Sequence, residues 1–257
     1  MTEPALPVLM YHGLHASEQD AGRFDPVYSV TPARFAEQMD WLCANGYRSI
    51  RLDAVGNGVH DRCIVISFDD GDASNVNVAL PLLRERGMVA EFFVTSDFIG
   101  QPGMLTVRDL NTLAKAGMGV QSHGRSHRFL EDLDAEAMYA ELRDSKQRLE
   151  AASGERVTAV AFPGGRGAGR ERDAALGIGY RHVLGSVPGH NRERRRHECY
   201  ERIAITRDMQ LSDFAALVAW RGWKPRYARA RFRLLRVPKR LLGNDRYQRL
   251  RARLLTR

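Results

Sequence analysis

The sequence has 257 residues, of which 44% are hydrophobic and 27% charged, a composition typical of globular proteins that bury a sizeable core. No stretch reaches the roughly 18 apolar residues of a bilayer-spanning helix, the N-terminus lacks a signal-peptide pattern, and the three cysteines form no CxxC pair. We therefore expect a cytoplasmic protein without a disulfide framework. The net charge of +8 is uneven, because residues 221–257 hold 14 basic residues and one acid, whereas residues 1–220 are net acidic.

Strand and helix patterns alternate along the first 220 residues. Short apolar runs predict buried strands at 7–11, 63–68, 89–95, 119–122 and 157–162. Helical patterns lie between them. One begins at the capping residue Thr31, and two others begin at Thr106 and at about Asp134. Such repeats predict a parallel α/β fold, and their number favours a distorted (β/α)7-8 barrel. No strand is followed by a GxGxxG or P-loop motif, which argues against nucleotide binding.

Two of the predicted strands end in residues suited to metal chemistry. Asp69 and Asp70 follow one strand, and adjacent carboxylates on an extended chain point in different directions, so one can bind a metal while the other holds a water. A helix cap and a solvated carboxylate are the alternative for this pair. His123 and His127 follow another strand, and their spacing predicts one face of a helical turn, as a shared metal requires. Two imidazoles and a carboxylate form an open ligand set that can activate water.

A third strand ends in the segment Ala161-Phe162-Pro163-Gly164-Gly165. Glycines there allow a backbone N–H to approach a ligand closely, as an oxyanion donor must, although the same residues also suit a plain loop.

These three segments, SFDDG at 67–71, HGRSH at 123–127 and AFPGG at 161–165, resemble the motifs of the polysaccharide deacetylases, which form carbohydrate esterase family 4 and are also called the nodulation-protein-B homology domain. The resemblance covers roughly residues 7–220. It implies the deacetylase type of (β/α) barrel, with Asp69 as general base and the Gly164 N–H as oxyanion donor. The implied metal ligands are Asp70, His123 and His127.

Some positions depart from the family pattern. Gly124 stands where a hydroxyl residue is more usual, and Ala161 occupies the place of an arginine that orients the base in many members. The late strand at 202–206 lacks the histidine that usually serves as general acid. The segment VLMYHG at 8–13 resembles a branch acting on exopolysaccharides, in which an N-terminal Tyr-His supplies the acid, so His12 is the expected acid. The alternatives are His182, His190 and His197. Substrate contacts are expected from Tyr11, Phe162, Pro163, Gly165 and Arg166.

The resemblance implies a metal-dependent hydrolase that removes N-acetyl groups from amino sugars of a poly- or oligosaccharide, in cell-surface or exopolysaccharide biosynthesis. Zinc is the expected divalent ion, and cobalt, nickel or iron also suit these ligands. Two alternatives stay open: an amidohydrolase acting on a small cyclic amide or imide with the same fold, and a catalytically idle binding protein. A glycosidase using Asp69 and Asp70 would leave both histidines unexplained.

The basic C-terminal segment divides the chain into an expected catalytic domain at 1–220 and a helical tail at 221–257. In the tail Tyr247, Leu250 and Leu254 share one helical face beside arginines. Residues 225–257 are therefore expected to contact an anionic membrane surface, which would bring the enzyme to a lipid-linked glycan. A solvated helical face is the alternative, and no nucleic-acid partner is expected.

Overall fold

A computed structural model of the protein describes residues 5–17, 24–55, 62–167, 169–191 and 199–242. Its centre is an eight-stranded sheet with the order β10-β1-β5-β6-β7-β8-β9 and with β4 beside β5. All these strand pairs are parallel. The strands are β1 (Val8–Tyr11), β4 (Arg48–Ser49), β5 (Cys63–Phe68), β6 (Glu91–Val94), β7 (Gly119–Ser122), β8 (Ala159–Ala161), β9 (His182–Leu184) and β10 (Ile203–Ala204).

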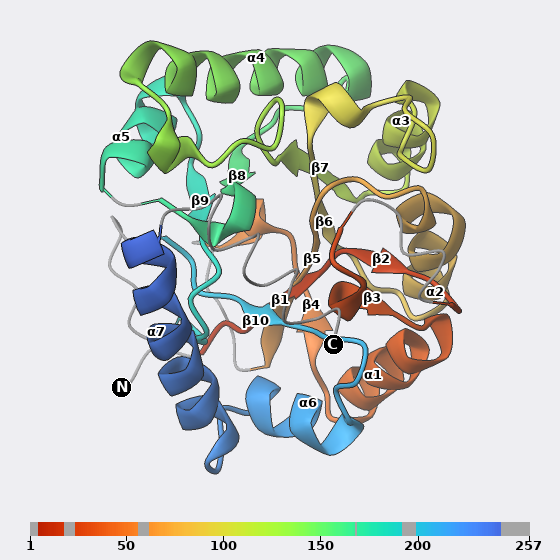
Figure 1. Cartoon of the computed structure of the whole chain (residues 1–257). Helices are drawn as coiled ribbons and strands as arrows, with labels where there is room; N and C mark the ends of the chain where they lie inside the picture. Colours follow the sequence, from red (N-terminus) through yellow and green to blue (C-terminus); the bar gives the residue numbers. More distant parts are fainter. Residues whose placement is uncertain (1–4, 18–23, 56–61, 168, 192–198, 243–257) are drawn as a thin grey trace.

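The sheet curls until its two edges approach each other. A parallel bridge joins Leu184 of β9 to Tyr200, which lies just before β10. Helices surround the strands (Figure 1), as in the predicted distorted (β/α) barrel, which is thereby confirmed. The helices are α1 (Pro32–Ala44), α2 (Leu80–Glu85), α3 (Val107–Lys115), α4 (Ala135–Ser153), α5 (Gly169–Ile178), α6 (Leu211–Val218) and α7 (Lys224–Leu242).

Capping residues begin three of the helices, and the cap at Thr31 was predicted. Thr31 accepts a hydrogen bond from the Arg34 N–H at the start of α1, and Asp134 accepts one from Ala137 at the start of α4. Thr106 and Asp109 form a capping box at the start of α3. Among the described helices none is long and apolar enough to cross a bilayer.

Shorter elements connect the strands and helices. Strands β2 (Gly13–Leu14) and β3 (Ser29–Val30) form a small parallel sheet beside the barrel. Single 3₁₀ turns lie at Pro26–Tyr28, Leu52–Ala54, Ser96–Phe98, Leu130–Asp132 and Pro163–Gly165, and a π-helical turn lies at Asn75–Ala79 before α2.

The alternation of side chains along the strands separates two apolar cores. Along β5, Ile64 and Ile66 belong to the large core under the helices, whereas Cys63 and Val65 belong to the smaller core that also holds Phe93. Because successive strand residues point to opposite faces, the inward positions of β1, β5 and β7 continue to the residue that follows each of these strands. This alternation of inward and outward positions decides which side chains at the strand ends enter the mouth of the barrel.

Candidate metal centre and active site

Three side chains that the sequence identified as metal ligands converge at the carboxyl ends of β5 and β7. Asp70, His123 and His127 each offer a ligand atom, and these atoms all lie within 4.8 Å of one another. Oδ1 of Asp70 lies 3.3 Å from Nε2 of His123 and 3.2 Å from Nε2 of His127. Asp70 and His123 are buried, and His127 is partly exposed. The cluster therefore has an enclosed side made by protein and an open side at the surface.

The donor set fits a divalent cation. Oδ1 of Asp70 is buried and has no hydrogen-bond partner among the described residues, although two imidazole nitrogens face it. Burial alone raises the pKa of Asp70, but the two imidazoles outweigh it and hold this pKa well below the usual range. An ionised, otherwise unsatisfied carboxylate oxygen opposite two imidazoles is the environment in which a metal with nitrogen and oxygen ligands binds.

The orientation of His123 is fixed by its second ring nitrogen. Nδ1 lies 2.8 Å from the carbonyl oxygen of Ala161 in β8. A carbonyl can only accept a hydrogen bond, so Nδ1 carries the proton and the lone pair of Nε2 points toward Asp70. The neighbouring strand thus selects the tautomer that a metal ligand needs.

The backbone around the ligands differs from the predicted helical turn. Residues 123–127 form a loop, and His127 has a φ of +64°. Asp70 also lies in the left-handed region, with a φ of +74°. The prediction of a helical turn was wrong, since two histidines four residues apart meet here because the loop folds back. Positive φ at two of the three candidate ligands is strain of the kind that clusters at functional sites.

Gly71 makes the turn after the two aspartates possible. Its φ is +88°, and a Cβ built on it would lie 2.9 Å from Cγ1 of Val94. Both the backbone conformation and the contact with β6 therefore require glycine at this position.

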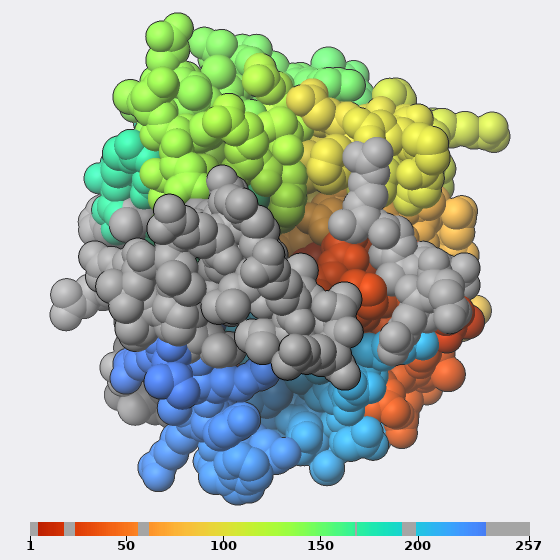
Figure 2. Space-filling model, in the orientation of Figure 1, coloured from red at the N-terminus to blue at the C-terminus, as the bar shows by residue number. Residues whose placement is uncertain are grey.

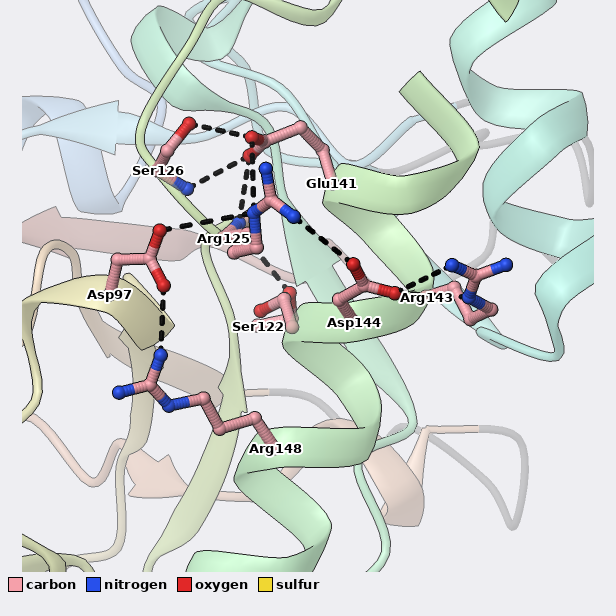
Figure 3. A network of polar contacts seen from close by, with 10 residues as sticks. Asp97, Ser122, Arg125, Ser126, Glu141, Arg143, Asp144 and Arg148 are labelled. Atoms are coloured by element: carbon pink, nitrogen blue, oxygen red, sulfur yellow. Dashed lines mark hydrogen bonds and ion pairs between the residues drawn. The ribbon is translucent and has the colours of Figure 1, made fainter. Parts of the chain in front are cut away.

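Glu141 of α4 holds the loop that carries both histidines (Figure 3). Its side chain is buried, and Oε2 accepts hydrogen bonds from the N–H groups of Arg125, at 3.0 Å, and Ser126, at 2.8 Å. Oε1 accepts a third from the Ser126 hydroxyl at 2.6 Å. Arg125 in turn contacts Asp97 and Asp144 at the surface. No local pattern links Glu141 to the loop, and sequence reasoning missed it.

Asp69, the candidate base, is paired with an arginine that the sequence did not predict. Arg202 donates from its two terminal nitrogens to Oδ1 and Oδ2 of Asp69, at 2.7 and 2.8 Å, and both side chains are buried. Burial raises the pKa of Asp69, but the guanidinium outweighs it, so the pKa lies below the usual value. Arg202, in the segment just before β10, thus fixes the plane of the Asp69 carboxylate, a contact that Ala161 cannot make.

His12 lies beside this pair. Residues Tyr11 and Phe68 are in register on β1 and β5, and the Asp69 N–H donates to the Tyr11 carbonyl, so His12 and Asp69 follow adjacent strands. The His12 ring stacks on Tyr28 with centroids 4.7 Å apart, and its Nδ1 is buried without a hydrogen-bond partner among the described residues. Burial lowers the pKa of His12, and the carboxylates of Asp70 and Asp69 oppose this shift.

The expected substrate residues separate into two groups. Tyr11 and Phe162 are fully buried in the large core, and the Tyr11 hydroxyl donates to Oε1 of Gln38. Their contact with substrate stays a prediction. In the structure both side chains point away from the mouth of the barrel, because Tyr11 is an outward residue of β1 beside His12 and Phe162 follows the inward Ala161 at the end of β8. Pro163 is buried, Gly164 is exposed with a φ of +64°, and Gly165 is half-buried. Arg166 lies over the Phe129 ring and pairs with Glu131.

The other histidines considered as general acids lie elsewhere or are not described. His182 lies on β9 near the Tyr200 hydroxyl, and His190 stacks on Trp220. His197 lies outside the described residues. A surface hollow of about 540 Å³ is lined by Lys146, Arg156 and Arg181 among others, at the opposite end of the barrel strands. The catalytic candidates do not line it.

Comparisons with known proteins relate the chain to one family. Residues 56–183 match the family model of polysaccharide deacetylases, a segment that contains both aspartates, both histidines and Gly164 but neither His12 nor Arg202. The Bacillus subtilis protein YxkH, named provisionally as a polysaccharide deacetylase, is 26% identical over 219 residues, which is 83% of this chain and 76% of that protein.

Solved structures show the same fold. The polysaccharide deacetylase BC0361 of Bacillus cereus superimposes with a TM-score of 0.76 at 25% identity, covering 84% of this chain and 69% of that chain. The deacetylase PplD of Streptococcus pyogenes, solved with acetate, has a TM-score of 0.76 at 23% identity, covering 84% of this chain and 99% of that chain.

Proposed function

Because the chain belongs to the polysaccharide deacetylase family of hydrolases, we propose that it removes acetyl groups from N-acetylated amino sugars of a poly- or oligosaccharide. The observation that carries this proposal is the convergence of Asp70, His123 and His127 on one point, beside a buried carboxylate and an imidazole. A site for a cation, a base and an acid is what hydrolysis of an unactivated amide needs.

Asp70, His123 and His127 would hold a divalent cation, and zinc is the ion that two imidazoles and one carboxylate suit best. Cobalt, nickel and iron are compatible with the same ligands. When bound, such a cation lowers the pKa of water and polarises the amide carbonyl.

The chain's own residues handle the protons. Asp69 is ionised across the neutral range because Arg202 lowers its pKa, and it accepts the proton of the attacking water. Arg202 donates one hydrogen bond to each carboxylate oxygen of Asp69. Each oxygen can accept a second one, so a lone pair remains for this proton transfer. His12, whose pKa burial lowers and the two aspartates raise, donates a proton to the departing amine nitrogen. The exposed Gly164 N–H stabilises the developing oxyanion. The C–N bond breaks, and acetate and a free amino sugar leave.

The decisive experiment measures acetate released from N-acetylglucosamine oligomers by the chelator-treated protein before and after zinc is restored. We expect release only with the metal, and no ring opening of small cyclic amides or imides. Hydrolysis of a cyclic imide without acetate release would replace the glycan substrate with a small molecule. Full activity after removal of all metal would overturn the proposed site.

The proposal places the enzyme in the cytoplasm, in the synthesis of a cell-surface or exopolysaccharide. Fractionation of cells that produce the protein, followed by an assay of each fraction, tests this location.

A further inference from the structure

One face of α7 is packed against the body of the protein. Arg229 pairs with Glu201 and donates to the Pro188 carbonyl, and Lys224 pairs with Asp213 of α6 at 2.8 Å. Ala228 packs against the large core. These contacts fix the rotation of α7 about its axis, and its opposite face therefore points to solvent.

That opposite face carries the most exposed large apolar side chains of the described residues. Leu234, Trp223 and Tyr227 are 73%, 62% and 57% exposed. At 100° per residue, positions 223, 227 and 234 fall within a narrow arc of a helix that begins at Lys224. We call these three residues the apolar stripe. Atoms of this helix lie on the molecular surface in Figure 2.

Arginines border the apolar stripe on both sides. On the same helical wheel Arg226 and Arg233 lie on one side and Arg231 on the other, and all three are exposed. The sequence from 221 to 244 contains no Asp or Glu. The face is thus apolar and aromatic along its centre and cationic along its edges.

We propose that the apolar stripe and its bordering arginines dock the protein on a bilayer containing anionic phospholipids. Trp and Tyr favour the boundary between headgroups and acyl chains, Leu234 adds apolar area, and arginines contact the headgroups from the edges. This partner goes beyond the proposed hydrolysis. It also rests on different residues from the predicted face of Tyr247, Leu250 and Leu254, which lies outside the described residues.

Two other partners fit this face less well. A nucleic acid would use arginines and free aromatic faces, but the Trp223 and Tyr227 rings pack edge to face, with centroids 5.6 Å apart, and an exposed leucine gives no contact to bases or phosphates. A second copy of the chain would bring two arginine-rich edges together without acidic partners, and like charges repel.

The test is sedimentation of the full chain with vesicles of phosphatidylcholine alone or with about 30 mol% phosphatidylglycerol. The expected result is binding to the anionic vesicles that weakens as salt rises from about 0.1 to about 0.5 M. Combined Trp223→Ala, Tyr227→Ala and Leu234→Ala should weaken it at least about tenfold, because buried apolar area is lost. Arg226→Glu with Arg233→Glu should weaken it by a similar factor.

Matched controls are exposed residues on other helices. Val107 of α3 and Tyr139 of α4 are 50% and 46% exposed, and their replacement by alanine should leave vesicle binding unchanged. Arg108→Glu on α3 controls for charge, and thermal melting checks that each variant is folded. Equal binding by the stripe variant and the wild type, equal binding to neutral and anionic vesicles, or binding to nucleic acid without vesicle binding would each overturn the proposal.

Discussion

Arg202 and Asp69 form a bidentate ion pair inside the barrel, 133 residues apart in sequence. Arg202 also donates from Nε to the Gly185 carbonyl at 2.7 Å, so the guanidinium is held from two sides. The pair joins the edge of the sheet at β10 to the end of β5 and fixes the plane of the carboxylate. The two parallel N–H groups of a guanidinium fix the orientation of a carboxylate, whereas a single ammonium group does not.

The first prediction follows from this geometry. Arg202→Lys keeps a positive charge near Asp69 but removes the fork, and the carboxylate should turn away from its productive orientation. We expect turnover to fall about 10²-fold, as misplacement of a catalytic group by about 1 Å can cause. Bound metal, measured by elemental analysis, should be unchanged because Arg202 contacts no ligand directly. Unchanged turnover would show that Asp69 does not depend on this partner.

The sequence predicts the barrel well because its strands and caps are local signals. The apolar run of β5 has the predicted bounds, Thr31 caps its helix as expected, and α3 and α4 begin one residue after the predicted starts at Thr106 and Asp134. The core positions of Tyr11 and Phe162, which the sequence did not predict, share one cause. A strand that is apolar on both faces does not reveal which of its residues point inward. An assignment that is shifted by one residue therefore places a core side chain in the mouth of the barrel.

Contacts between residues far apart in the sequence, such as those of Glu141 and Arg202, could not be predicted from local sequence patterns. Glu141 lies on a helix among other charged residues, and only the packing of α4 against the 123–127 loop buries it. The sequence around Arg202 weakly indicates a buried ion pair. An arginine next to the apolar residues Ile203 and Ala204 needs an acidic partner if this strand is buried in a barrel. Which carboxylate serves as that partner depends on how the edges of the sheet approach each other.

The second prediction concerns the metal ligands. His127→Ala should lose most of the bound metal, because one of three ligand bonds disappears and no other His, Cys, Asp or Glu of the described residues joins this cluster. His182→Ala, at a histidine of β9 outside the cluster, is the control and should keep the metal. Asp69→Asn should also keep the metal while turnover falls by about 10² or more, as for loss of a general base. Full metal content in His127→Ala would show that the ligand set is wrong.

The third prediction tests the support of the histidine loop. Glu141→Ala removes three hydrogen bonds to the loop, and zinc affinity measured by chelator competition should fall about 10- to 100-fold. Glu141→Gln can keep these contacts, because an amide oxygen accepts from two N–H groups and the amide can donate to the Ser126 hydroxyl. It should restore most of the affinity. Asp144→Ala, which removes surface contacts with Arg125 and Arg143 but none with the loop backbone, is the control. Equal loss in all three variants would contradict the proposed support.

The fourth prediction concerns pH and stability at the other end of the barrel. Glu91 is fully buried, and burial raises its pKa although Arg51 and the Leu52 N–H oppose the shift. A raised pKa means that the folded state prefers the neutral acid, so this contribution to stability is present at low pH and is lost as the pH rises through the folded-state pKa. Glu91→Gln cannot ionise. Its free energy of unfolding relative to wild type should therefore increase from pH 5 to pH 8 in urea titrations, and a constant difference would contradict the shift.

The last prediction separates a proton donor from a binding residue at His12. The ring stacks on Tyr28, and burial lowers its pKa, so the protonated ring is a stronger acid and gives its proton readily to a nitrogen that gains basicity as the C–N bond breaks. An amine leaves poorly without a proton, whereas a phenolate leaves readily. His12→Ala should therefore lose about 10²-fold or more in turnover of an N-acetyl sugar and much less on an aryl acetate, with its metal retained. Equal losses on both substrates would assign His12 to binding or folding. Loss of the metal would instead place it among the ligands, because its carboxylate neighbours Asp69 and Asp70 lie within electrostatic reach of its ring.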